Sequence, residues 1–199
     1  MVRLCFLVPW STPATLGAIS WLWLLDSIYS PIDWVLRRAG LLGVPGALLG
    51  AESNLHWLGR PGTAMGAVIA VQVWRLTPLA AVVVMAGLAS LPREIDEAAR
   101  VDGAGFWRRL FEITEPLMLP VSAVAALFTA IFTVTDLGVV RVLTNGGPNN
   151  ATQVLTSWAF LRGIDGGDVG QGAAVALFLF PLLLAAAITI LRFVRGLEL

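Results

Sequence analysis

Lysine is absent from the sequence, and cysteine and histidine occur once each. All 13 basic residues are arginine, so neither a Walker-type phosphate loop nor Schiff-base chemistry is expected, since both depend on a lysine amine. Cys5 has no second cysteine with which to form a disulfide within the chain, and His56 has no cysteine or carboxylate ligands at metal-site spacing. The composition therefore predicts no nucleotide, metal or other cofactor on this chain.

Charge is also scarce. Only 13% of the residues are charged, about half the usual share in soluble proteins. The 13 basic and 13 acidic residues balance, so no nucleic-acid partner is expected. Hydrophobic residues make up 57% of the chain, and the mean hydropathy is +0.81. This balance is typical of a membrane protein.

Four apolar stretches have the length of a bilayer span, about 20 residues. A soluble domain could bury one such helix, but four favour an all-α membrane protein, a multi-span helical bundle. The first stretch follows Arg3 and could also be read as a signal peptide, but it passes Trp21 and Trp23 without a small-residue cleavage site. The Trp pair suits an interfacial belt better. The predicted spans are residues 4–25, 63–91, 117–140 and 172–194.

The arginines predict the orientation, because they are enriched on the cytoplasmic side of a membrane. With four spans, the N-terminus, the 92–116 segment and the C-terminus share one side. That side carries seven arginines and the other carries five, so both termini are predicted to be cytoplasmic. The first group is Arg3, Arg93, Arg100, Arg108, Arg109, Arg192 and Arg195, and the second is Arg37, Arg38, Arg60, Arg141 and Arg162.

Two connections carry local signals of their own. In the 26–62 connection, Pro31 and Gly40 bracket a short amphipathic helix. The 92–116 segment is a predicted helix–turn–helix that starts after Pro92, with Asp96 and Arg100 four residues apart. Gly103 can provide the left-handed residue that ends the first helix, and a second short helix would follow over residues 106–113. Small side chains between flanking charges favour a docking element over a solvated loop.

This segment resembles the EAA loop of binding-protein-dependent ABC importer permeases. The family pattern is E-A-A, three residues, G, nine residues, then I-x-L-P. Here Glu97, Ala98 and Ala99 are followed by Gly103, Ile113 and Pro116 at matching spacing, while Glu115 stands where the family usually has Leu.

Three further motifs resemble the branch of this family that imports sugars and glycerol phosphate. They are a Trp four residues before a Pro (Trp74 and Pro78), the run AGLASLP at 86–92, and Asp136 followed by LTNGGP at 143–148. Thr135 stands where the branch usually has Phe. Together the motifs extend the similarity over nearly the whole chain.

The resemblance implies a type I ABC importer permease, with residues 1–199 as one permease domain that lacks the family's first two spans. The implied location is a bacterial or archaeal plasma membrane, with multiple passes. ATP hydrolysis is expected on a separate ATP-binding subunit, so this chain is not expected to be an enzyme. The other implied partners are a second permease subunit, an extracytoplasmic solute-binding protein, membrane lipid and a sugar-like substrate.

The resemblance also assigns candidate residues. The ATPase-coupling set is Glu97, Ala98, Ala99, Asp102, Gly103, Ile113 and Pro116. Charges inside spans are candidates for the substrate path, and the candidate path residues are Trp74, Arg75, Thr133 and Asp136. Arg75 has a second interpretation, a structural partner such as Asp136 or a carbonyl freed by Pro78. The Thr133 hydroxyl also has a second interpretation, which is a hydrogen bond to a backbone carbonyl of its own helix.

Other classes of protein remain open. An intramembrane enzyme would need a nucleophile–base pair or metal ligands inside the spans, which one His and one Cys do not supply. A channel or scaffold subunit would explain the spans but not the E-A-A-x-x-x-G spacing. A permease of another binding-protein-dependent importer class, or a non-transporting fragment, would retain the motifs.

Overall fold

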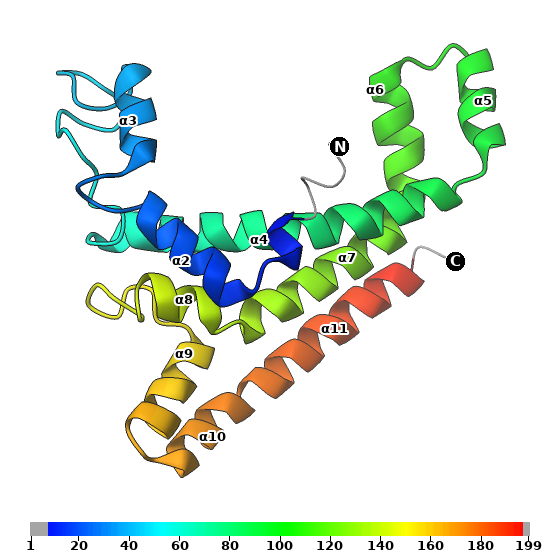
Figure 1. The fold of residues 1–199 in the computed structure, drawn as a ribbon. Coiled ribbons are helices and arrows are strands. Elements are labelled where there is room, and N and C mark those ends of the chain that lie inside the picture. The colour runs from blue at the N-terminus through cyan, green and yellow to red at the C-terminus, as the bar shows by residue number, and fades with distance from the viewer. Residues whose placement is uncertain (1–7, 197–199) are drawn as a thin grey trace. The chain divides into compact units, whose positions relative to one another are not determined.

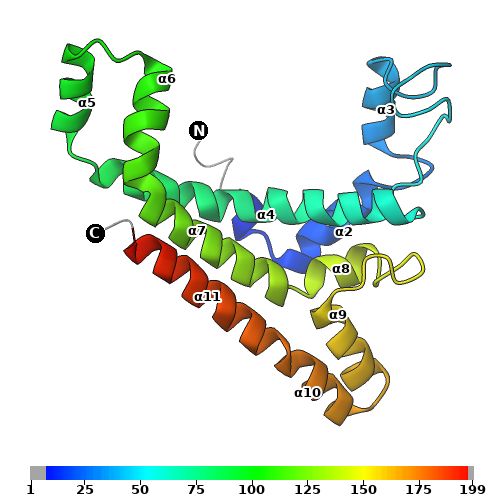
Figure 2. The same ribbon diagram turned by 180° about the vertical axis from the view of Figure 1, so that it is seen from behind.

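The computed structural model describes residues 8–196, and over that range the chain is helical and contains no strand, which confirms the all-α prediction (Figures 1 and 2). Residues 8–11 are also helical. The helices are α2 (Ala14–Leu24), α3 (Pro31–Arg38), α4 (Pro61–Ser90), α5 (Arg93–Val101), α6 (Phe106–Arg108), the π-helix η1 (Arg109–Thr114), α7 (Glu115–Thr135), α8 (Gly138–Leu143), α9 (Leu155–Phe160), the π-helix η2 (Leu161–Asp165), α10 (Val169–Leu177) and α11 (Leu179–Arg195).

Within residues 8–196, three helical segments are long and apolar enough to cross a membrane: Pro61–Ser90, Phe106–Thr135 and Val169–Val194. In the most apolar 18 residues of each, the buried share is 28%, 11% and 0%, so their side chains are largely uncovered. A soluble monomer rarely exposes so much contiguous apolar surface. The segments correspond to the second, third and fourth predicted spans, and they agree with a multi-span membrane protein.

The first predicted span differs from the other three. Its described part is interrupted at Pro13, and α2 after it has only 11 residues. Proline has no N–H and its ring conflicts with the preceding helical turn, so a run of apolar residues does not guarantee one helix. Residues 4–7 of the predicted span lie outside the described part, and the four-span count remains a prediction.

Prolines also shape the third and fourth spans. The helix after Gly105 does not stop near Ile113, as the sequence suggested, but continues through η1 into α7. The wider π-helical turn lies directly before Pro116, whose ring would conflict with the carbonyl of Glu112 in a regular α-helix. In the last span, the helix is interrupted at Phe178, three residues before Pro181, as expected for a proline kink.

The described chain divides into two compact units, one with the residues up to Arg75 together with Val134–Leu179, the other with Leu76–Thr133 together with the residues from Phe180 on. In the first unit, α2 packs against α8 and α9 against α10. Its core is apolar and is formed by Leu25, Ala67, Val68, Val71, Val139, Val140 and Leu143.

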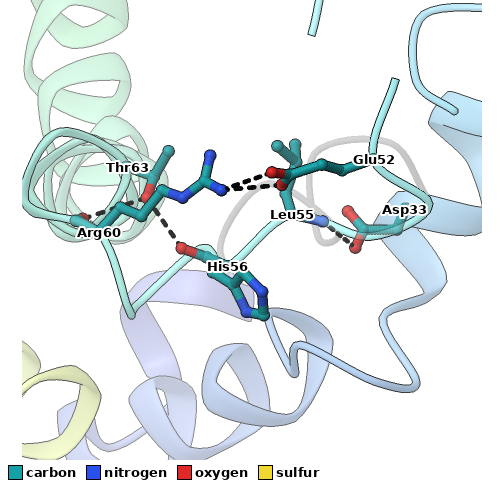
Figure 3. Close-up of polar contacts among 6 residues, drawn as sticks. All are labelled: Asp33, Glu52, Leu55, His56, Arg60 and Thr63. Atoms are coloured by element: carbon teal, nitrogen blue, oxygen red, sulfur yellow. Dashed lines mark hydrogen bonds and ion pairs between the residues drawn. The ribbon is translucent and has the colours of Figure 1, made fainter. Parts of the chain in front are cut away.

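The 26–62 connection in the first unit is held by a buried carboxylate. Asp33 on α3 is only 1% exposed, and it accepts hydrogen bonds from the Leu55 amide (3.0 Å) and the Trp57 indole (2.8 Å). Figure 3 shows Asp33 beside Leu55, and near them the exposed pair of Glu52 and Arg60. The Asp33 side chain therefore joins α3 to two residues that lie 22 and 24 positions further along the chain.

Asp26 stabilises the turn that enters this connection. Its Oδ1 atom accepts the backbone N–H groups of Ile28 and Tyr29, each at 2.8 Å. Both bonds lower the pKa of the Asp26 carboxyl, and the bond from Tyr29 has the larger effect. The carboxylate form is the one that accepts both bonds.

Gly87 marks the contact between α4 and α7 in the second unit. A Cβ atom at this position would lie 2.7 Å from both Met118 Cε and Val121 Cγ1. The glycine of the AGLASLP run therefore permits a close approach of two membrane-spanning helices, since small residues at such interfaces let the backbones come together.

Gly87→Ala is expected to lower the free energy of unfolding by about 1–3 kcal/mol, the usual cost of overpacking. Gly66→Ala is a matched control on the same helix, because a Cβ there meets nothing within 4 Å; it should be neutral or stabilising by up to about 1 kcal/mol. Thermal unfolding of both variants in detergent measures the difference. Equal midpoints for the two would contradict close packing at Gly87.

Candidate functional site

The 92–116 segment forms a hairpin of two helical arms, α5 and α6–η1, in the second unit (Figure 1). Gly103 has a φ of +74°, the left-handed conformation that favours glycine. The Gly103 N–H bonds to the Arg100 carbonyl and the Ala104 N–H to the Ala99 carbonyl, each at 3.0 Å. This pair of bonds is a Schellman motif, so the turn ends α5 and starts the return arm.

Asp96 joins the two arms. Its Oδ1 atom lies 2.7 Å from Arg109 Nη1 on the return arm, and its Oδ2 atom lies 2.8 Å from Arg100 Nη2 on α5 itself. The guanidinium side chain of Arg109 is only 19% exposed. The cavity between the arms is small, about 40 Å³, and Ile95 and Ile113 are among the residues that line it. The two arms of the hairpin are therefore closely packed and joined by an ion pair. This ion pair attaches α5 to the helix that continues into the third span.

The predicted coupling residues separate into two groups. Ala99 is buried between the arms and Ile113 is half-buried there, so these two hold the hairpin together. The exposed group is Glu97, Ala98, Asp102, Gly103 and Pro116. The exposed face of α5 thus carries carboxylates beside a small side chain, a surface that another protein can approach closely.

Sequence reasoning missed the bridge from Asp96 to Arg109, and the structure leaves the aromatic side chains of the return arm exposed. Phe106, Trp107 and Phe111 are each more than half exposed, and the rings of Trp107 and Phe111 stack with centroids 6.0 Å apart. The i, i+4 spacing of Trp107 and Phe111 places these two rings on the same side of the arm. The bridge could not be predicted, because its partners are thirteen positions apart.

In the first unit, Arg75 on α4 pairs with Asp136, which directly follows α7. The side chains are 16% and 9% exposed. Asp136 Oδ2 accepts a hydrogen bond from the Arg75 guanidinium. Its Oδ1 atom accepts one, at 2.8 Å, from the backbone N–H of Gly138, which is the first residue of α8. The two charges neutralise each other at a largely buried position. The partner suggested for Arg75 is thus present, and the role of the pair in the substrate path stays a prediction.

The other two candidate path residues have local partners. The ring of Trp74 meets that of Trp21 edge to face, with centroids 5.6 Å apart, and lies next to Gly17 on α2. The hydroxyl of Thr133 is exposed and donates to the Thr129 carbonyl at 2.7 Å, so it bonds back to its own helix. No group of three or more Cys, His, Asp or Glu side chains in residues 8–196 is arranged to hold a metal ion.

Long apolar helices, one extended by a charged hairpin, define a multi-span membrane protein. The chain belongs to the family of binding-protein-dependent transport system inner membrane components, whose model matches residues 1–198. This confirms the family suggested by the EAA-like spacing.

Two relatives illustrate the similarity. The trehalose/maltose transport system permease protein MalF of Thermococcus litoralis is 33% identical over 96% of this chain and 61% of its own length. The sulfoquinovosyl glycerol transport system permease protein SmoG of Agrobacterium fabrum is 31% identical over 98% of this chain and 59% of its own length. The chain thus spans about three fifths of these relatives.

A solved bacterial ABC transporter involved in the import of alginate has the same fold. The TM-score is 0.81 at 18% identity, over 98% of this chain and 65% of that one. At this identity the likeness supports the fold of the chain and no more.

Proposed function

We propose that the chain is a transmembrane permease subunit of an ATP-driven importer and forms part of the path for a sugar or related polyol. Family membership supports the transport role. The names of the two relatives, which concern maltose or trehalose and sulfoquinovosyl glycerol, support the substrate class. The alternatives are a permease for another class of substrate and a scaffold that transports nothing.

The hairpin is the observation that carries the proposal. Its exposed face, with Glu97, Ala98 and Gly103, would dock on a separate ATP-binding subunit, and Glu97 would pair with a basic group there. Movement of α5 would reach the third span through the bridge from Asp96 to Arg109 and through the continuous helix. Such coupling joins two distant sites through one element that both can displace.

The remaining partners follow from the same proposal. A solute-binding protein would deliver substrate to the 26–62 and 141–171 connections, and a second permease subunit would complete the path. With the hairpin and both termini on the cytoplasmic side of a bacterial or archaeal plasma membrane, these connections face outward. The buried pair of Arg75 and Asp136 would border the substrate path, where charges inside a membrane are commonly found.

Docking is tested by co-purifying the chain with ATP-binding subunits encoded beside its gene. Glu97→Lys is expected to lower the captured ATPase at least tenfold, because loss of one partner of a close interfacial charge pair costs about 2–5 kcal/mol. Gly103→Pro should have a similar effect, since proline cannot adopt a φ of +74°.

The control is Glu52→Lys, the same charge change at an exposed carboxylate of the 26–62 connection. It should leave capture unchanged, and membrane insertion should be equal for all three variants. Equal capture by the hairpin variants would show that the segment is not a docking element. Absence of an ATPase in every sample would favour the scaffold.

A further inference from the structure

The corner between α2 and α3, within the first unit, contains a cavity of about 470 Å³. The residues that line it are Ser20, Trp23, Leu24, Asp26, Tyr29 and Pro31. The side chains of Trp23 and Tyr29 are 74% and 85% exposed, so the rest of the described chain leaves them largely uncovered. Packing within the chain therefore does not account for two open aromatic rings beside a carboxylate.

Asp26 gives this cavity a negative charge. Its Oδ1 atom accepts the backbone N–H groups of Ile28 and Tyr29, and these two bonds fix the orientation of the carboxylate. Among the described residues, no hydrogen bond or ion pair engages the Oδ2 atom, and no arginine lies within ion-pair distance of it. The cavity thus combines an uncompensated carboxylate with aromatic rings, a set of groups that attracts a cation.

The depth of the corner follows from its contact with α4. Leu25, next to Asp26, belongs to the same apolar core as Ala67 and Val68 of α4. Ala67 lies about 9 Å from the start of α4 at 1.5 Å per residue. The 30 residues of α4 are about 45 Å long and the hydrocarbon core is about 30 Å thick, so about 7 Å at each end reaches the headgroup region. The corner is therefore at the level of the lipid headgroups, where Trp and Tyr are enriched.

The helix α3 extends this surface away from the cavity. Figures 1 and 2 show α3 lying across the direction of the first half of α4, as expected for a helix in the interface plane. Asp33 is on its buried side, whereas Trp34 and Val35 are more than half exposed. The Arg38 guanidinium lies over the Trp34 ring, 5.0 Å from its centroid. An apolar and aromatic surface thus continues from the cavity along the membrane.

We propose that the α2–α3 corner is a lipid-binding site for the ammonium group of a zwitterionic phospholipid such as phosphatidylethanolamine. Asp26 pairs with the ammonium group, and the rings of Trp23 and Tyr29 contact it by cation–π interactions. Leu24 and Pro31 add apolar surface for the hydrocarbon part of the lipid. An anionic phospholipid without an amine gives Asp26 no partner and is repelled by its charge. The site depends on the membrane location of the chain and not on what the chain transports.

Lipid titration followed by native mass spectrometry tests the site. The purified chain in detergent is titrated with dioleoylphosphatidylethanolamine or dioleoylphosphatidylglycerol, which differ only in the headgroup. The ethanolamine lipid should bind the unaltered chain about fivefold or more tightly than the glycerol lipid, the effect of one cation–π contact or ion pair. Asp26→Asn keeps an oxygen that can accept the two backbone N–H groups and removes the charge, so the preference should disappear. Trp23→Leu should weaken the ethanolamine lipid more than the glycerol lipid.

Glu52→Gln is the matched control, since it neutralises an exposed carboxylate of the same connection outside the cavity. It should leave the preference for the ethanolamine lipid unchanged. Equal binding of both lipids by the unaltered chain would overturn the proposal, and so would an unchanged preference in Asp26→Asn. Displacement of the lipid by excess free ethanolamine would also overturn it, because the site would then take soluble amines. If Asp26→Asn does not fold, the variant of the exposed Trp23 decides, and an unchanged preference there contradicts the site.

Discussion

Asp136→Leu is expected to destabilise the chain by about 3–5 kcal/mol, because removing one partner of a buried ion pair leaves the other charge uncompensated. The Arg75 guanidinium would remain at a position where its side chain is only 16% exposed. The variant also removes the acceptor for the Gly138 N–H at the start of α8. The expected readout is a lower thermal unfolding midpoint in detergent and less folded protein in the membrane.

Two further variants separate the contributions. Asp136→Asn keeps an oxygen that can accept the Gly138 N–H and loses only the charge, so it isolates the ion pair. Replacing Arg75 and Asp136 together by leucine should recover much of the stability, because buried pairs are often replaceable by apolar residues. A double variant as unstable as Asp136→Leu alone would show that the pair is not the source of the loss.

Asp33→Ala is expected to loosen the 26–62 connection and to cost about 2–6 kcal/mol of stability, because two donors, one buried and one half-buried, each lose a partner at about 1–3 kcal/mol. These donors are the amide of Leu55 and the indole of Trp57 (Figure 3 shows the first). Hydrogen exchange at the Leu55 amide should accelerate strongly, because this bond is its protection. Exchange in α7 should change little.

Glu52→Ala is the control for this loss. Glu52 pairs with Arg60 within the same connection, but both side chains are more than half exposed. Exposed pairs contribute about 0–1 kcal/mol, so exchange at Leu55 should remain slow. Fast exchange in both variants would mean that the connection depends on its surface charges and not on the buried carboxylate.

The features that depend on local sequence were predictable. Apolar runs defined three of the spans, and glycines marked the ends of α5 and α3, where Gly103 and Gly40 have positive φ. Opposite charges in two apolar runs suggested the pair of Arg75 and Asp136, since either charge alone is costly in a membrane. These inferences use only residue type and spacing, which the sequence contains in full.

The features that depend on packing were not predictable. The bonds of Asp33 connect residues 22 and 24 positions apart, and no periodic pattern reports such contacts. The cavity at the corner of α2 and α3 can be recognised only after both helices are placed. At Pro13 the sequence instead predicted a helix that is too long. A hydropathy window averages over a proline, whereas the proline interrupts the helix.

The absence of a flexible joint between the hairpin and the third span has a mechanical consequence. Phe106–Thr135 is 30 residues of uninterrupted helix, about 45 Å long at 1.5 Å per residue. Such a rod acts as a lever, so a tilt of about 5° at the hairpin displaces the far end by about 4 Å. A small rotation imposed on α5 would therefore displace the far end of this helix by more than the length of a hydrogen bond, about 3 Å.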